Sequence, residues 1–67
     1  MLDNKIHIGR VEKKMTQQQL ADAVGVSRQT IVALEKNKYN PSLILAFKIS
    51  DALGKEITSI FEYKEEL

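Results

Sequence analysis

The chain has 67 residues, a net charge of +1 at pH 7 and no cysteine. A chain of this length forms one small domain, which buries only about 60% of its unfolded surface and gains stability from association. The lack of cysteine excludes disulfides, thiolate metal sites and a cysteine nucleophile. Neither an apolar run of about 20 residues nor the apolar core of a signal peptide is present, so we expect a cytoplasmic protein without membrane segments.

The charge is distributed unevenly along the chain. Residues 1–40 carry seven Lys and Arg against four Asp and Glu, whereas residues 41–67 carry three against five. A basic excess favours contact with phosphate, so the first part is the one expected to face an acidic partner such as nucleic acid. The second part would then face away from that partner.

Residues 4–14 predict the first helix, with Ile6 and Val11 as its apolar contacts. Gly9 lies inside this helix and costs about 1 kcal/mol relative to Ala. The basic residues are expected to be solvated, and Met15, which begins the next connection, is expected to join the core. The pattern therefore favours a short helix with one weak point.

Two short helices joined by a tight turn follow. Thr16 is placed to cap the first of them, and Gln19, three residues later, completes a capping box. Leu20 and Val24, four apart, form one apolar edge of this helix. Gly25 comes next and can adopt the positive φ that ends a helix and turns the chain.

The second helix of the pair is predicted to begin after Ser27, a favoured N-cap residue. Ile31 and Leu34 lie three apart on its inner face. Val26 is an apolar plug between the two helices, and Ala21 is small enough for them to cross closely. A helix, a Gly-centred turn and a second helix are the plan of DNA-reading helix-turn-helix proteins. The outward face of the second helix begins with Arg28, Gln29 and Thr30.

The remaining chain predicts two more helices and a tail. Pro41 opens a fourth helix, which Gly54 ends. A short fifth helix is expected over residues 56–61. The tail, residues 61–67, alternates apolar and charged side chains, and it is either a strand paired with residues 1–3 or a frayed end. The apolar stripe of the fourth helix comprises Leu45, Ala46, Phe47, Ile49 and Leu53.

These features together resemble the lambda-repressor/Cro type of helix-turn-helix regulator, often called Xre-like. The resemblance covers residues 4–61. It implies an all-α, five-helix lambda-repressor-like bundle, extended in short stand-alone members by a small antiparallel strand pair. One DNA-binding domain would span residues 1–67, with the helix-turn-helix at 16–36 and a dimerisation region at 53–67. The residues that carry the resemblance are Arg10, Thr16, Gln17, Leu20, Ala21, the run 25–31, Glu35 and the run 37–42.

The resemblance also implies roles for individual residues. Arg28 and Gln29 would meet base edges in the major groove, where Arg suits guanine and Gln suits adenine, and Thr30 would touch base or backbone. Arg10 and Glu35 would form a largely internal ion pair between the first and third helices. The plain alternative is that all of these are solvated surface residues. Contacts with the DNA backbone are implied for Gln17, Ser27, Lys38, Tyr39 and Asn40.

Two residues depart from the family's pattern. Gly9 stands where a larger apolar residue is usual, which would loosen the first helix. Ile44 stands where a polar residue is common, which predicts an exposed contact there.

The C-terminal segment is rich in apolar residues for so small a bundle. One reading is that all of them belong to the core; the reading that we favour is that some form a dimer interface. A two-fold dimer would place two recognition helices about 34 Å apart and read an inverted repeat. The predicted interface residues are Ile57, Ile60, Phe61, Tyr63 and Leu67.

The sequence therefore predicts a regulator that binds specific double-stranded DNA as a homodimeric repressor. Two alternatives stay open: an antitoxin of a toxin–antitoxin pair, and a helical adaptor that binds protein or RNA. No metal, cofactor or small-molecule ligand is expected, because His7 is the only histidine and has no partner at ligand spacing. Asp22 and Asp51 have no nearby acidic partner for acid–base chemistry, so we expect no enzyme activity.

Overall fold

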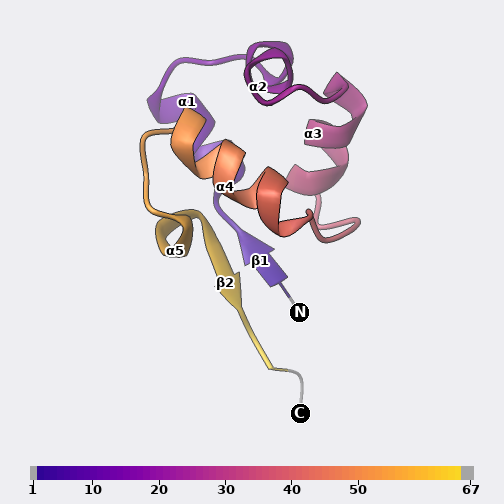
Figure 1. Cartoon of the computed structure of the whole chain (residues 1–67), viewed down its shortest axis with the longest axis vertical. Coiled ribbons are helices and arrows are strands. Elements are labelled where there is room, and N and C mark those ends of the chain that lie inside the picture. The colour runs from indigo at the N-terminus through magenta and orange to yellow at the C-terminus, as the bar shows by residue number, and fades with distance from the viewer. Residues whose placement is uncertain (1, 66–67) are drawn as a thin grey trace.

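The computed structural model describes residues 2–65, which form five helices and one two-stranded antiparallel sheet. Figure 1 shows α2 and the strand pair at opposite ends, with α4 between them. The prediction of a five-helix bundle is therefore confirmed. The elements in chain order are β1 (Leu2–Asn4), α1 (Ile6–Glu12), α2 (Gln17–Val24), α3 (Arg28–Glu35), α4 (Leu43–Ala52), α5 (Ile57–Ile60) and β2 (Phe61–Tyr63).

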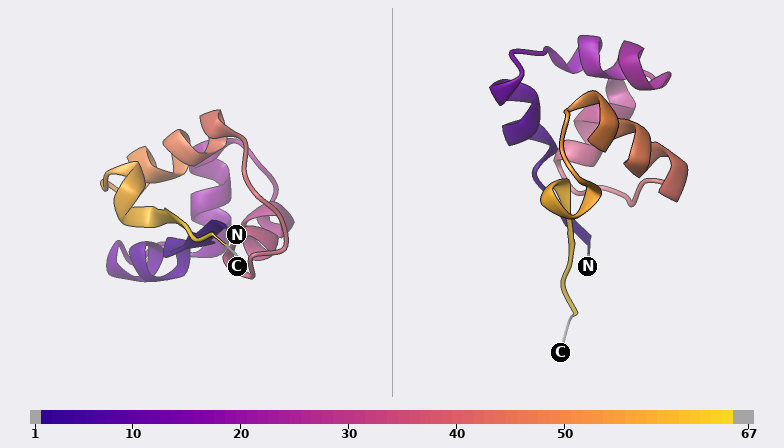
Figure 2. Two further views of the ribbon diagram at one scale, coloured as in Figure 1. Left: turned by 90° about the horizontal axis from the view of Figure 1, so that it is seen from below. Right: turned by 60° about the vertical axis from the view of Figure 1, so that its left-hand side comes forward.

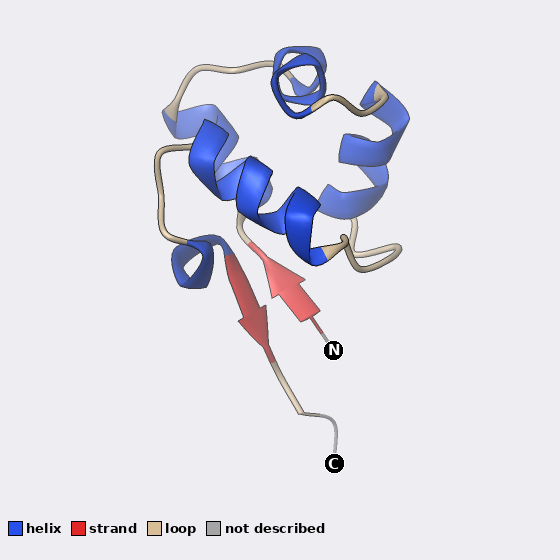
Figure 3. Ribbon diagram, in the orientation of Figure 1, coloured by secondary structure: helices blue, strands red, loops and turns tan. Residues whose placement is uncertain are grey.

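Residues 2–4 and 61–63 pair as strands, so the strand predicted for the tail forms over its first three residues, while residues 66–67 lie outside the described part of the chain. Leu2 lies opposite Tyr63, and Asn4 lies opposite Phe61. Figures 2 and 3 show this pair extending from one end of the helical bundle, away from α2. Since the strand uses residues up to Asn4, the first helix begins later than predicted, at Ile6, and α5 is likewise shorter than residues 56–61.

Helix α1 differs from its prediction in which residues face inward. Ile6 and Gly9 are its buried residues, whereas Val11 is 53% exposed and makes no core contribution. A Cβ atom on Gly9 would lie 3.1 Å from Cδ1 of Leu53 and 3.2 Å from Cδ1 of Ile60. The glycine therefore permits close packing of α1 against the C-terminal half of the chain, rather than simply weakening the helix.

The caps of the helix-turn-helix form as the sequence predicts. The backbone N–H of Gln19 donates to Thr16 Oγ1 at 3.0 Å, and the N–H of Thr16 donates to Gln19 Oε1 at 2.8 Å. Gly25 ends α2 with φ at +76°, and the N–H of Thr30 donates to Ser27 Oγ at 3.2 Å. These local bonds satisfy N–H groups that a helix start leaves without partners.

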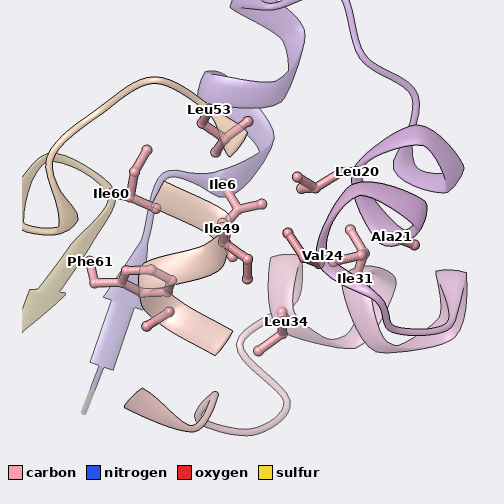
Figure 4. Packing of buried hydrophobic residues seen from close by; sticks show 11 residues of the cluster. Ile6, Leu20, Ala21, Val24, Ile31, Leu34, Ile49, Leu53, Ile60 and Phe61 are labelled. Carbon is pink, nitrogen blue, oxygen red and sulfur yellow. The ribbon is translucent and has the colours of Figure 1, made fainter. Parts of the chain in front are cut away.

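The core joins both halves of the chain around α4. Figure 4 shows side chains from α1, α2, α3, α4 and the C-terminal segment meeting in one cluster. Phe47 was predicted to widen the apolar stripe of α4, but it is 55% exposed, because Ala46, Ile49 and Leu53 turn a different face of this helix inward. The core residues are Ile6, Leu20, Ala21, Val24, Ile31, Leu34, Ala46, Ile49, Leu53, Ile60 and Phe61.

Two residues predicted for the dimer interface belong to this core instead. Ile60 is 2% exposed and Phe61 9% exposed. The short helix α5 packs against α4, and Ile60 at its end and Phe61 at the start of β2 enter the cluster, where Figure 4 shows them beside Ile6, Ile49 and Leu53. Their apolar surface is therefore used within one chain and is not available to a second one.

Candidate nucleic-acid interface

A bidentate ion pair ties α1 to α3. Arg10 Nε donates to Glu35 Oε2 at 2.7 Å, and Arg10 Nη2 donates to Glu35 Oε1 at 3.2 Å. The side chains are 11% and 8% exposed, respectively. Arg10 Nη1 also donates to the backbone oxygen of Met15 at 2.8 Å, which fixes the connection before α2. The predicted pairing of Arg10 with Glu35 is thus present, and it is largely internal.

Glu35 is held in its charged form. Burial raises the pKa of this carboxyl, but hydrogen bonds from Arg10 and Gln17, together with the charges of Arg10 and His7, outweigh burial and bring the pKa below the ordinary value of 4.5. His7 adjoins the pair from the outside, with its Nδ1 3.0 Å from Arg10 Nη2. A guanidinium only donates hydrogen bonds, so Nδ1 accepts in this contact when the imidazole is neutral, whereas a protonated His7 places its charge beside Glu35, with Nδ1 3.6 Å from Oε1.

Gln17 connects the ion pair to the start of α3. Its Nε2 donates to Glu35 Oε1 at 3.2 Å, while Arg28 Nη2 donates to Gln17 Oε1 at 3.4 Å. A carboxylate only accepts and a guanidinium only donates, so the two neighbours select one orientation of the amide. The first residues of α2 and α3 are thereby held side by side around an open hollow. This hollow is lined by Arg10, Thr16, Gln17, Gln18 and Arg28.

The predicted base-reading residues lie on the outer side of α3. Arg28 and Gln29 are exposed, and Thr30 is half-buried. The hydroxyls of Ser27 and Thr30 lie 3.0 Å apart and are hydrogen-bonded to each other. On the opposite side of the helix, Ile31 is fully buried and Leu34 also lies in the core. The helix therefore has one fixed face and one free face, as the sequence predicts.

The loop after α3 presents the other predicted backbone-contact residues. Lys38, Tyr39 and Asn40 are all exposed, Tyr39 by 44%. The turn begins at Asn37, whose φ of +57° is a conformation that Asn tolerates better than most residues. This loop follows directly from α3, so it belongs to the same surface region as the C-terminal end of that helix.

Asn4 was missed by the sequence analysis, although it anchors the end of α3. Its Nδ2 donates to the backbone oxygen of Leu34 and to Asn37 Oδ1, both at 2.8 Å. Its Oδ1 accepts the N–H of Ile6 at 3.1 Å. The bond with Ile6 spans two residues, so it could have been predicted as a local cap of α1. The other two partners lie about 30 residues away, and no local sequence pattern indicates those bonds.

The remaining apolar candidates that the structure describes expose some or most of their surface. Ile57 is half-buried, Tyr63 is 72% exposed, and Leu67 lies outside the described residues. Ile44 is 70% exposed, as expected. The sequence analysis did not single out Leu43, which is also 70% exposed.

Across residues 2–65, no group of three or more His, Cys, Asp and Glu side chains could hold a metal ion. Within the same range, every helix is too short and too polar to cross a bilayer.

The fold and the free face of α3 define a helix-turn-helix protein of the DNA-binding class. A family profile described as "Helix-turn-helix" matches residues 6–60. A transcriptional regulator of this type from Methanocaldococcus jannaschii is 49% identical over 65 residues, covering 97% of this chain and 98% of its own. The chain therefore belongs to the helix-turn-helix family of transcriptional regulators, and its fold and relatives are not those of enzymes.

Two further proteins are similar to this chain, one in sequence and one in structure. An immunity repressor of Bacillus phage phi105 is 39% identical over 51 residues, which cover 76% of this chain and 35% of the repressor. A solved structure from Bacteroides fragilis, of a protein to which DNA binding is ascribed, superposes with a TM-score of 0.84 at 31% identity. That superposition covers 92% of this chain and 100% of the other.

Proposed function

We propose that this protein is a sequence-specific double-stranded DNA-binding repressor, which acts in the cytoplasm as a homodimer and reads an inverted repeat. The observation that carries the proposal is the free outer face of α3. Arg28 and Gln29 are exposed there, while Ile31 fixes the helix from behind and the pair of Arg10 with Glu35 holds its far end. In this proposal Arg28, Gln29 and Thr30 contact base edges in the major groove.

The DNA backbone would be held around this reading face. Gln17 keeps one amide hydrogen that is not used by Glu35, and this hydrogen can donate to a phosphate oxygen. Ser27 begins α3, and the exposed loop continues the surface beyond its end. Repression would follow from occupying a promoter. The loop residues assigned to the backbone are Lys38, Tyr39 and Asn40.

Selection of bound fragments from randomised duplex DNA tests the proposal. The expected result is an enriched inverted repeat whose half-sites are centred about one helical turn, roughly 34 Å, apart. Enrichment of no sequence would contradict DNA reading. Recovery of a bound protein or RNA together with failed DNA selection would favour an antitoxin or an adaptor instead.

Salt dependence separates backbone contacts from base contacts. Each phosphate contact releases counterions, so the slope of log affinity against log salt should fall by about 0.9 for each contact that is lost. Because both subunits of the proposed homodimer lose this contact, Lys38→Gln should lower the slope by about two and weaken all DNA alike. Lys48→Gln, an exposed change on α4, is the matched control and should leave the slope unchanged.

The dimer would use the surface residues of the C-terminal segment. Ile57 and Tyr63 are the described members of the predicted set that expose surface, and Leu67 is retained as its third member. Sedimentation of Ile57→Glu and Tyr63→Glu at micromolar concentration should show monomers. Ile44→Glu changes another exposed apolar residue and is the control, which should remain dimeric. A wild-type protein that is monomeric even on DNA would contradict this part of the proposal.

A further inference from the structure

Helix α3 carries apolar side chains outside its buried face. Its core residues are Ile31 and Leu34, yet Val32 and Ala33 are also apolar and only half-buried. Among the described residues, neither Val32 nor Ala33 belongs to the core or to the apolar side chains that pack against it. A surface helix of a small domain usually carries polar residues on its free side, so this pair needs another explanation.

Val32 stands next to the proposed base-reading residues. It follows Arg28 by four positions and Gln29 by three, and residues at these spacings are neighbours on a helix surface, with Cβ atoms about 5–6 Å apart. Successive base pairs rise about 3.4 Å. When Arg28 meets one base pair, Val32 therefore reaches the groove one to two base pairs further along.

The chemistry of valine restricts what it can read there. Its side chain neither donates nor accepts a hydrogen bond, and the apolar group that DNA presents in the major groove is the C5-methyl of thymine. Placing valine against the amino group of cytosine or the carbonyl of guanine would remove water from a polar group without replacing its hydrogen bond, which costs free energy. An apolar residue at this place therefore favours an A·T pair.

We propose that Val32 determines specificity by contacting a thymine methyl group, one to two base pairs from the pair read by Arg28. This inference rests on the proposed function. It adds an apolar contact to the polar ones, so the recognition surface would combine hydrogen bonding at Arg28 and Gln29 with methyl contact at Val32.

The test uses the duplex found by selection and replaces each thymine of one half-site in turn by deoxyuridine, which lacks only the methyl group. At one position the wild-type protein should lose about fourfold in affinity, the equivalent of one buried methyl-sized group. Val32→Ala should bind the unmodified duplex more weakly and should lose nothing further at that position. Such non-additivity identifies the two groups as contacting partners.

The controls separate this inference from the proposal on which it depends. Ile44→Ala removes a comparable exposed apolar side chain from α4 and should keep the full deoxyuridine effect. Two results would overturn the role of Val32 while leaving DNA reading intact. One is selective binding in which no deoxyuridine substitution lowers the affinity; the other is an equal loss of affinity in wild type and Val32→Ala. Failure to select any duplex would overturn the proposed function, and the role of Val32 with it.

Discussion

The two ends of α3 are held in different ways. Its start is fixed by local features: Gly25 turns the chain, and Ser27 caps the helix three residues before Thr30. Its end is fixed by distant residues, because Arg10 binds Glu35 across 25 positions and Asn4 bonds to Leu34 across 30. The exposed outer face of α3 lies near the locally fixed end, whereas the bonds of Arg10 and Asn4 lie at the other end.

This difference shows how so small a domain can expose the proposed reading surface without losing its order. At the start of α3, the long-range side-chain bond of Arg28 to Gln17 Oε1 is long, at 3.4 Å, and uses one of the five guanidinium hydrogens, so the others stay available for the proposed contact with DNA. At the far end, Glu35 and Asn4 hold the helix through Arg10 and the backbone of Leu34, neither of which is proposed to meet DNA. If this account is correct, changes at the far end should cost folding stability, and changes at the start should cost less.

The largest effect is expected from Glu35→Ala at the far end. The substitution leaves Arg10 buried and without its charge partner, which typically costs about 3–5 kcal/mol. Urea unfolding measures the loss. Glu56→Ala, an exposed change, is the control and should stay within about 0.5 kcal/mol of wild type. Equal effects of the two substitutions would show that the ion pair contributes nothing.

The same residue predicts a dependence on pH. The pKa of Glu35 is lowered in the folded state, so its contribution is complete above its ordinary pKa of 4.5 and is lost as pH falls through the folded value. The free energy of unfolding should therefore fall in acid below about pH 4.5 in wild type, and less steeply in Glu35→Gln. Parallel pH profiles for the two proteins would exclude this role of Glu35.

Asn4→Ala should have the next largest effect. It removes the two bonds that Nδ2 donates to Leu34 O and Asn37 Oδ1, and the bond that Oδ1 accepts from the N–H of Ile6. The expected cost is about 1–3 kcal/mol in thermal or urea unfolding. Asn40→Ala in the exposed loop should have little effect on stability. A stable Asn4→Ala protein would indicate that the strand pair does not anchor α3.

Gly25→Ala tests the turn at the start of α3. A Cβ atom there meets nothing within 4 Å, so the cost comes only from the positive φ and should be about 1–2 kcal/mol. Unfolding experiments measure it. A loss of unfolding free energy well above that range would show that the substitution disturbs more than the backbone conformation of residue 25.

Ser27→Ala should have the smallest effect, about 1 kcal/mol, because it removes only the capping bond from the N–H of Thr30 and an exposed bond between the hydroxyls of the same two residues. Ser59→Ala, an exposed change in α5, is the matched control. A cost as large as that of Glu35→Ala would contradict the contrast between the two ends of α3.

The same contrast explains what could be predicted from the sequence. The capping box at Thr16, the turn at Gly25 and the cap at Ser27 depend on residues within a few positions of one another, and all three were predicted correctly. The bonds of Asn4 depend on where the chain ends meet, so they were missed. The burial of Ile60 and Phe61 depends on how α5 packs against α4, which no local pattern encodes.

The outer face of α3 was predicted only in part. The exposure of Arg28 and Gln29 follows from the helical period once Ile31 and Leu34 are assigned inward. The pairing of Arg10 with Glu35 came from family resemblance, since no local pattern links residues so far apart. That Val32 lies half-buried outside the core emerges only when the whole set of core contacts is known.

The most direct test of the account compares Arg28→Ala with wild type on two duplexes, the selected operator and a scrambled sequence of equal length. Reading of a base by Arg28 predicts a loss of roughly 5- to 150-fold for each half-site of the operator, from about 1–3 kcal/mol of discrimination per contact, and a much smaller loss on scrambled DNA. An equal loss on both duplexes would show that Arg28 contributes charge alone, and would contradict the claim that the free face of α3 reads sequence.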